Sequence, residues 1–142
     1  MDLRQLIPNL AVSGQITPQD VTSLAEAGFK VLINNRPDAE VGASEDSQTM
    51  AAAAEAAGMT YHYLPFTPGQ ITPDLITGFA AAMTDRGPHF AYCRSGNRST
   101  VLWALTQADK RPEDEILEIA AKAGYDLTGV RPLIQSLASR RG

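Results

Sequence analysis

Short apolar runs alternate along the chain with longer segments of helical periodicity. The apolar runs are rich in β-branched and aromatic residues, which is typical of strands. They cover residues 9–15, 30–34, 60–66 and 89–93. The run at 30–34 contains consecutive apolar residues, a pattern that favours a strand covered on both faces. The pattern therefore predicts about four strands in a buried sheet.

Signals for helix starts and stops separate these runs. Thr17 supplies an N-cap, Pro18 suits the first helical position, and Gly28 supplies a stop. The Thr-Pro start recurs at residues 72–73. Helices are therefore predicted over residues 17–28, 47–58, 72–87, 98–110, 111–125 and 127–141.

The alternation of strands and helices predicts the fold class. Strands joined through helices run parallel and are connected by right-handed crossovers. We expect an α/β fold with a small parallel sheet of about four strands flanked by helices, arranged as a three-layer sandwich. The length of 142 residues suits a single domain spanning 1–142, in which residues 110–142 form a helical tail packed on the sheet.

Composition narrows the class of protein further. Apolar residues make up 44% of the chain, enough for an ordinary core, and the net charge is −4. This acidic balance argues against a general nucleic-acid binder and against a surface that seeks anionic membranes. A lone cysteine forms no internal disulfide, and the start of the chain lacks the apolar stretch of a signal peptide. No window approaches the roughly 20 apolar residues of a membrane span. We therefore expect a soluble, cytoplasmic protein, with its oligomeric state left open.

The single cysteine, Cys93, stands at the predicted end of a strand and is followed by a short polar loop and a helix. Binding sites in α/β sheets gather at the carboxyl ends of strands. The helix N-terminus offers unpaired N–H groups and a positive partial charge, which favour anions. Gly96 permits a positive φ and a close approach to a ligand, and Arg98 adds a permanent charge with a fork of donors. These residue types in this order predict a reactive cysteine beside an anion site.

The loop is expected to do two things. It stabilises the thiolate of Cys93, with Ser99 or Thr100 donating a further hydrogen bond, and it holds an anionic substrate group next to the sulfur. The alternative is a buried, structural cysteine, but this explains the accompanying glycine and arginine poorly. The predicted catalytic residues are Cys93 and Arg98, and the predicted anion-binding loop comprises Arg94, Ser95, Gly96, Asn97 and Ser99.

These residues carry a resemblance to known families. The segment "YCRSGNRS" resembles the active-site loop of rhodanese sulfurtransferases, and it is also similar to the phosphate loop of cysteine-dependent tyrosine and dual-specificity phosphatases. Taken with "NLAVSGQITPQDVTSLAEAGFKVLINNRPDAE" and "YHYLPF", it resembles the phosphatase-like domain of beta-lactamase hydrolase-like proteins over roughly residues 5–110. The resemblance implies a dual-specificity-phosphatase-like fold and a covalent intermediate on Cys93.

Two features of the sequence bear on which group is transferred. Four residues separate Cys93 from Arg98, one fewer than in the phosphatase pattern, and a tighter loop suits a single extra sulfur atom. The resembling phosphatases carry an acid near the position of Thr67–Gly69, where this chain has none, and Asp74 reads as part of a helix start. Both features favour a persulfide-forming sulfurtransferase. A phosphatase acting on phosphotyrosine or a small phosphoester is the alternative, and a non-catalytic module that binds anions is the third hypothesis.

Other polar residues are weaker candidates. Arg36 and Asp38 follow the strand at 30–34 and are candidate pocket residues, although Pro and Asp also favour turns. His62 and His89 are expected to be structural, since His89 lies about 13 Å from the cysteine along a strand. The scattered histidines and the one cysteine make no zinc pattern, so no metal or organic cofactor is expected, and the partner is a small anionic substrate.

Overall fold

A five-stranded sheet forms the centre of the protein. The computed structural model describes residues 1–141. The strands are β1 (Arg4–Ile7), β2 (Leu10–Ser13), β3 (Val31–Asn34), β4 (Thr60–Tyr63) and β5 (His89–Tyr92). Their order across the sheet is β1-β2-β5-β3-β4, so the strand that precedes Cys93 lies in the middle. The α/β fold class predicted from the sequence is confirmed.

The sheet has one strand more than expected, and that strand is antiparallel. Strands β2, β5, β3 and β4 pair in parallel, whereas β1 pairs antiparallel with β2. Ile7 lies opposite Leu10, so a two-residue turn joins β1 to β2. Of the four residues of β1 only Leu6 is buried, and this explains why the hydrophobic pattern did not predict the strand.

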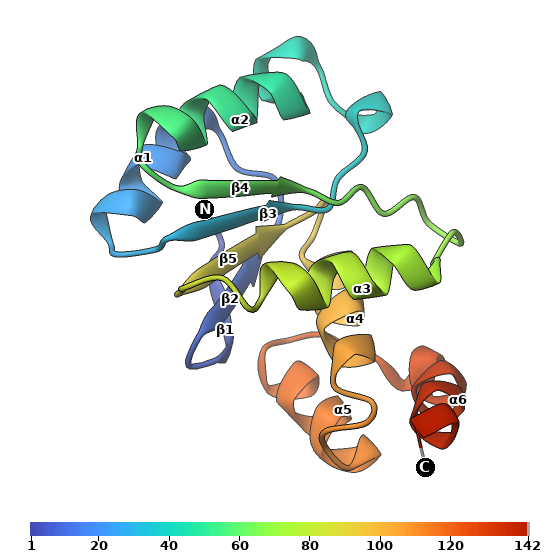
Figure 1. The fold of residues 1–142 in the computed structure, drawn as a ribbon. Coiled ribbons are helices and arrows are strands. Elements are labelled where there is room, and N and C mark those ends of the chain that lie inside the picture. The colour runs from blue at the N-terminus through green and yellow to red at the C-terminus, as the bar shows by residue number, and fades with distance from the viewer. Residues whose placement is uncertain (142) are drawn as a thin grey trace.

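Within residues 1–141 there are six α-helices. They are α1 (Pro18–Glu26), α2 (Ser47–Ala56), α3 (Pro73–Ala82), α4 (Asn97–Thr106), α5 (Glu113–Lys122) and α6 (Arg131–Arg141). Helices α1 and α2 lie on one face of the sheet, α3 and α4 lie on the other, and α5 and α6 lie beyond α4 (Figure 1). Three short 3-10 helices lie in the connections, at Asp38–Glu40, Ala43–Glu45 and Thr128–Val130. None of the helices within residues 1–141 is long and apolar enough to cross a membrane.

Two hydrophobic cores lie between the sheet and its helices, one on each face of the sheet. Alternate residues of a strand point to opposite faces, so Leu32 joins the core beneath α1 and α2 while Val31 and Ile33 join the larger core under α3 to α6. Helix α4 is the centre of this larger core, because every residue from Ser99 to Thr106 is buried. Trp103 lies fully buried there. The helix that follows Cys93 is therefore fixed by packing along most of its length.

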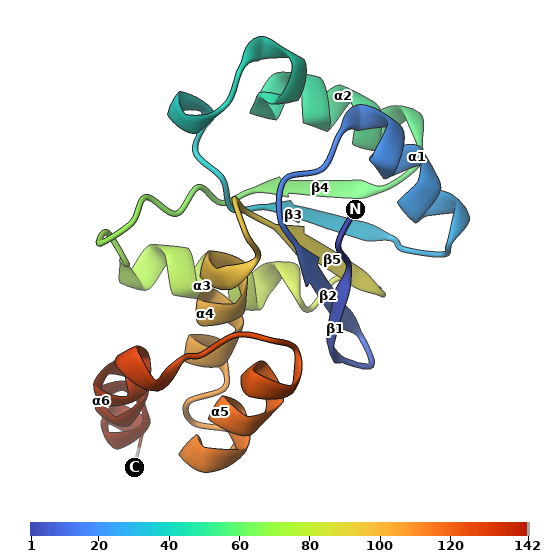
Figure 2. The ribbon, with the colours of Figure 1, turned by 180° about the vertical axis from the view of Figure 1, so that it is seen from behind.

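The chain after α4 packs onto the same core. Ile116, Leu117 and Ala120 of α5 and Ile134 of α6 belong to the larger core cluster. Arg131 of α6 forms an ion pair with Glu113 of α5 and another with Asp114 at 3.0 Å. In both views α5 and α6 lie beyond α4 on the side away from α2 (Figure 2). This part of the chain thus extends the α4 layer.

The cap of α1 gives a test of the local interactions that define these elements. Thr17 accepts from the Asp20 amide at 3.1 Å, and the Asp20 carboxylate accepts from the Thr17 amide at 2.9 Å. We expect Thr17→Ala to lower the free energy of unfolding by about 1 kcal/mol, measured by urea denaturation. Thr22→Ala, an exposed substitution within the same helix, is the control and should leave stability unchanged or slightly higher. Equal losses in both variants would contradict this role of the cap.

Candidate active site

Cys93 lies at the carboxyl end of the central strand, between two neighbouring strand ends. Its amide donates to the carbonyl of Ser13, the last residue of β2, at 3.3 Å, and Asn35 after β3 donates to the carbonyl of Tyr92 at 2.8 Å. The chain then turns through a short loop into α4, whose N-cap Gly96 has φ of +92°. This is the strand–loop–helix arrangement predicted from the sequence.

The loop directs a backbone donor at the sulfur. The amide of Gly96 donates to Cys93 Sγ at 3.1 Å, and the cysteine is fully buried. A hydrogen bond from an N–H group at a helix start is stronger when the acceptor is anionic, so the Gly96 amide is placed to stabilise negative charge that develops on the sulfur. Gly96 is required sterically as well as for its φ, because a Cβ here would collide with the hydroxyl of Tyr125.

The two hydroxyls expected to assist the sulfur point elsewhere. Ser99 Oγ donates to Asn35 Oδ1 at 2.8 Å, and Thr100 Oγ1 donates to the Gly96 carbonyl at 2.7 Å. Each hydroxyl has one proton, so neither donates to Cys93 in this arrangement. The prediction for Ser99 is thus corrected. Its buried hydroxyl ties α4 to the residue after β3, and Asn35 in turn donates to the Leu64 carbonyl at 2.9 Å.

Arg98 is held by an acidic residue from a distant part of the chain. Its Nη1 donates to Glu40 Oε2 at 3.0 Å and its Nη2 to Glu40 Oε1 at 2.7 Å. Nη1 also donates to the Phe66 carbonyl at 2.7 Å. The hydrogen bonds from Arg98 are the main reason that the pKa of Glu40 is lowered, despite some desolvation, so Glu40 is a carboxylate at neutral pH.

Of the two candidate pocket residues, Arg36 joins this ion-pair network. It donates through Nε to Glu40 Oε1 at 3.4 Å, through Nη2 to the Glu40 carbonyl at 3.1 Å, and through Nη1 to Gln15 at 3.2 Å. Glu40 therefore bridges Arg36 and Arg98. Glu40 was not among the site residues predicted from the sequence. The sequence signal that could have indicated Glu40 is its place, as an acidic residue, in the loop after β3, the strand that pairs in parallel with β5.

Asp38 has a structural contact instead. Its two carboxylate oxygens accept from the amide of Ser47 at 2.7 Å and from the Ser47 hydroxyl at 2.6 Å. Its own amide donates to the hydroxyl of Tyr63 at 2.8 Å. These bonds fix the loop that carries Glu40 to the start of α2.

The remaining loop residues lie on the surface of the site. Arg94, Ser95 and Asn97 are exposed. The Asn97 amide donates to Ser95 Oγ at 3.3 Å, within the loop. The Ser95 carbonyl accepts from the hydroxyl of Tyr125 at 3.0 Å. Tyr125 follows α5. It was not predicted as a site residue, because no local sequence pattern indicates a contact between residues 30 positions apart.

Asp74 and the histidines occupy the places expected of structural residues. Asp74 lies in the first turn of α3, which Thr72 caps by accepting from the Leu75 amide at 3.1 Å. His62 pairs with Asp85 at 2.6 Å. His89, at the opposite end of β5 from Cys93, is buried and hydrogen-bonds to Asn9 and to the Ala82 carbonyl. Within residues 1–141 no group of three or more His, Cys, Asp or Glu residues is arranged to hold a metal ion.

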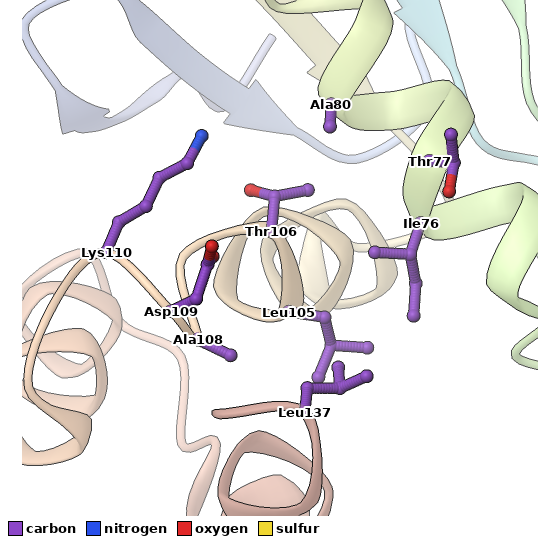
Figure 3. A pocket seen from close by; sticks show the side chains of 9 residues that line it. All are labelled: Ile76, Thr77, Ala80, Leu105, Thr106, Ala108, Asp109, Lys110 and Leu137. Carbon is purple, nitrogen blue, oxygen red and sulfur yellow. The ribbon is translucent and has the colours of Figure 1, made fainter. Parts of the chain in front are cut away.

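A separate cavity of about 370 Å³ lies among α3, α4 and α6 (Figure 3). Leu105 and Leu137 lie against each other at its base, with Ile76 facing them, and Thr106 and Lys110 lie on its other side. Its lining includes no residue of the Cys93 loop. This cavity is therefore distinct from the candidate active site.

Comparison with solved structures places this fold among phosphatases. A proposed phosphatase from Neisseria meningitidis Z2491 is 32% identical and superposes with a TM-score of 0.83, covering 96% of this chain and 99% of that one. A proposed phosphatase from Shewanella putrefaciens CN-32, 22% identical, has a TM-score of 0.77 over 99% of this chain and 93% of its own. The second likeness, at this identity, concerns the fold alone.

Comparison of sequences identifies the family. The beta-lactamase hydrolase-like protein of Agrobacterium fabrum is 37% identical in an alignment of 121 residues, and the match covers 83% of this chain. The chain spans only 28% of the length of that curated relative. Residues 2–110 match the family described as beta-lactamase hydrolase-like protein, phosphatase-like domain. The resemblance to rhodaneses stays a prediction from the loop sequence, whereas the chain belongs to the family of phosphatase-like domains of beta-lactamase hydrolase-like proteins.

Proposed function

We propose that this domain is a cysteine-dependent phosphatase that hydrolyses a small phosphoester. The observation that carries the proposal is the Gly96 amide directed at Cys93 Sγ at 3.1 Å, at the start of the helix that also carries Arg98. Membership of a phosphatase-like family supports phosphate over sulfur as the transferred element. This reverses the preference for sulfur transfer that the sequence alone suggested.

The proposed reaction has two steps. The Cys93 thiolate attacks phosphorus, an S–P bond forms, and the ester P–O bond breaks as its electron pair leaves with the departing oxygen. Water then attacks the phosphocysteine, the S–P bond breaks, and inorganic phosphate departs while the thiolate is regenerated. Amides of the loop between Cys93 and Arg98 stabilise the equatorial oxygens in both steps.

Arg98 is oriented for this role by its ion pair. A guanidinium has five N–H donors. Three of them are used by the two Glu40 oxygens and the Phe66 carbonyl. The Nε–H and one Nη2–H are left for two oxygens of a phosphoryl group, which matches the forked geometry that arginine offers to phosphate. Because Glu40 and Phe66 fix the guanidinium before substrate binds, little rotational freedom is lost on binding.

Protonation of the leaving group sets the expected substrate preference. Glu40 is held as a carboxylate by Arg98, and Asp38 is engaged by Ser47. Asp74, in the first turn of α3, lines a surface concavity together with Thr67 and Gln70 of the preceding connection. A phenolate leaves without a proton more easily than an alkoxide does, so aryl phosphates are expected to be the better substrates.

Sulfur transfer is the second candidate function. One observation favours it: only four residues lie between Cys93 and Arg98. In this reaction the thiolate attacks the outer sulfur of thiosulfate, a persulfide forms on Cys93, and sulfite leaves with the electron pair of the broken S–S bond. The persulfide then passes its outer sulfur to a nucleophile such as cyanide.

A paired assay separates the two candidates. We expect the wild-type protein to release phosphate from an aryl phosphate, and Cys93→Ser to lose this activity, because an alcohol at this position is a far weaker nucleophile. The same preparations are assayed for cyanolysis of thiosulfate, and mass spectrometry of the trapped protein identifies phosphate or sulfur on Cys93. Thiocyanate production with a sulfur adduct, and no release of phosphate, would establish the second candidate in place of the first.

The ion pair of Arg98 gives an independent prediction for activity. Glu40→Gln keeps the shape of the side chain and removes its charge, so the guanidinium loses its orienting partner. We expect kcat/KM for the aryl phosphate to fall on the order of 10-fold. Glu118→Gln, which removes an exposed partner of Lys122, is the matched control and should leave activity unchanged. Unchanged activity in Glu40→Gln would show that Arg98 needs no carboxylate to hold it.

The same variant predicts a dependence of stability on pH. The folded-state pKa of Glu40 is lowered, so the ion pair stabilises the fold above the pKa of an unfolded glutamate, about 4.3, and this contribution is lost as pH falls through the folded value. The difference in unfolding free energy between wild type and Glu40→Gln should therefore be largest at neutral pH and shrink in acid. Urea denaturation as a function of pH measures it, and a difference that grows in acid would contradict the assignment.

A further inference from the structure

We propose that Tyr125, in the helical segment that follows the family-matched region 2–110, is a positioning residue for the Cys93 loop. It acts through the peptide unit between Ser95 and Gly96. The inference rests on the proposed function for its effect on turnover, but its effect on the cysteine is a separate, measurable quantity.

Geometry of this peptide unit carries the argument. In a trans peptide the C=O and N–H groups point in opposite directions. The Ser95 carbonyl accepts from the Tyr125 hydroxyl at 3.0 Å, and the Gly96 amide of the same peptide donates to Cys93 Sγ at 3.1 Å. Holding the carbonyl outward therefore holds the amide inward. A rotation of this peptide would break both bonds, and the bond from Tyr125 also polarises the peptide so that its N–H becomes a stronger donor.

Tyr125 is itself fixed from several directions. It follows Gly124, which has φ of +100° and ends α5, and its amide donates to the Ala120 carbonyl at 2.9 Å. Arg4 of β1 donates to the Ala123 carbonyl at 3.0 Å, and its guanidinium lies 5.8 Å from the centre of the Tyr125 ring. Strand β1 and helix α5 contact each other directly. Strand β1 and helix α5 thus both hold the side chain of Tyr125 in place.

The environment of Tyr125 keeps its hydroxyl protonated, so that this group can donate a hydrogen bond. Burial raises the pKa of Tyr125, the negative charge of a Cys93 thiolate raises it further, and the positive charge of Arg4 opposes both. The tyrosine consequently retains its proton over the range in which a cysteine titrates. The hydroxyl also sits close against Gly96, where a Cβ would collide with it. A residue with a Cβ at position 96 would therefore displace either the Tyr125 side chain or the loop.

The test compares two tyrosines that differ in their contacts. Tyr125→Phe removes the hydroxyl and keeps the ring. Tyr92→Phe is the matched control, because Tyr92 is buried next to Cys93 in the sequence and its hydroxyl has no hydrogen-bond partner among the described residues. The fraction of thiolate is measured as a function of pH from its ultraviolet absorbance, with each protein referenced to the same protein carrying Cys93→Ser. Turnover of an aryl phosphate is measured in parallel.

We expect Tyr125→Phe to lower the ratio of thiolate to thiol at a given pH on the order of 3- to 10-fold, as weakening of one hydrogen bond to a charged group predicts. Its kcat should fall while KM changes little, and its thermal unfolding should stay close to that of wild type. Tyr92→Phe should match wild type in all three. Titration curves of wild type and Tyr125→Phe that coincide would overturn the proposal.

Two further outcomes are also decisive. If the titration curves separate but wild type releases no phosphate, the proposed function fails and the role of Tyr125 stands. If Tyr125→Phe does not fold, Tyr125→Met, whose flexible side chain fills the same space, takes its place with the same expected loss of thiolate. Wild-type behaviour of the thiol in that folded variant would overturn the proposal equally.

Discussion

The hydrogen bond from the Gly96 amide to Cys93 Sγ depends on a sharp turn between a buried strand and a buried helix. Strand β5 is held on both sides by parallel neighbours, and α4 is enclosed by the larger core from Ser99 to Thr106. Neither element can shift without disturbing close packing on several sides. The three residues between Cys93 and Asn97 therefore have few conformations open to them, and the positive φ of Gly96 makes the observed one accessible.

Support for this turn comes from both sides of the loop and from remote parts of the chain. On one side, Glu40 and the Phe66 carbonyl hold Arg98. On the other, Tyr125 contacts the Ser95 carbonyl. The first set acts on the side chain that would face the substrate, and the second acts on the backbone that faces the sulfur. The two supports are thus expected to affect different quantities, substrate binding and orientation in one case and thiolate formation in the other.

The parts of this site that could be predicted from sequence are the local ones. Cys93, Gly96 and Arg98 lie within six positions, and the strand before them and the helix after them have strong patterns of their own. The partners were not predictable, because Glu40 lies 58 positions from Arg98 and Tyr125 lies 30 from Ser95. Ser99 was assigned to the sulfur because it is near in sequence, whereas its hydroxyl faces Asn35. The edge strand β1 was missed since its only buried side chain is Leu6.

The contact made by Tyr125 bears on where the functional unit ends. The family match stops at residue 110, at the connection between α4 and α5, and the residues proposed to carry the chemistry all lie before it. Yet α5 and α6 contribute Ile116, Leu117 and Ile134 to the core around α4, and the residue after α5 reaches the loop itself. Removing this segment would expose apolar surface on the helix that positions the loop. On these grounds we propose that the helical tail belongs to the same domain as the cysteine, and that the whole of 1–142 is one folding and functional unit.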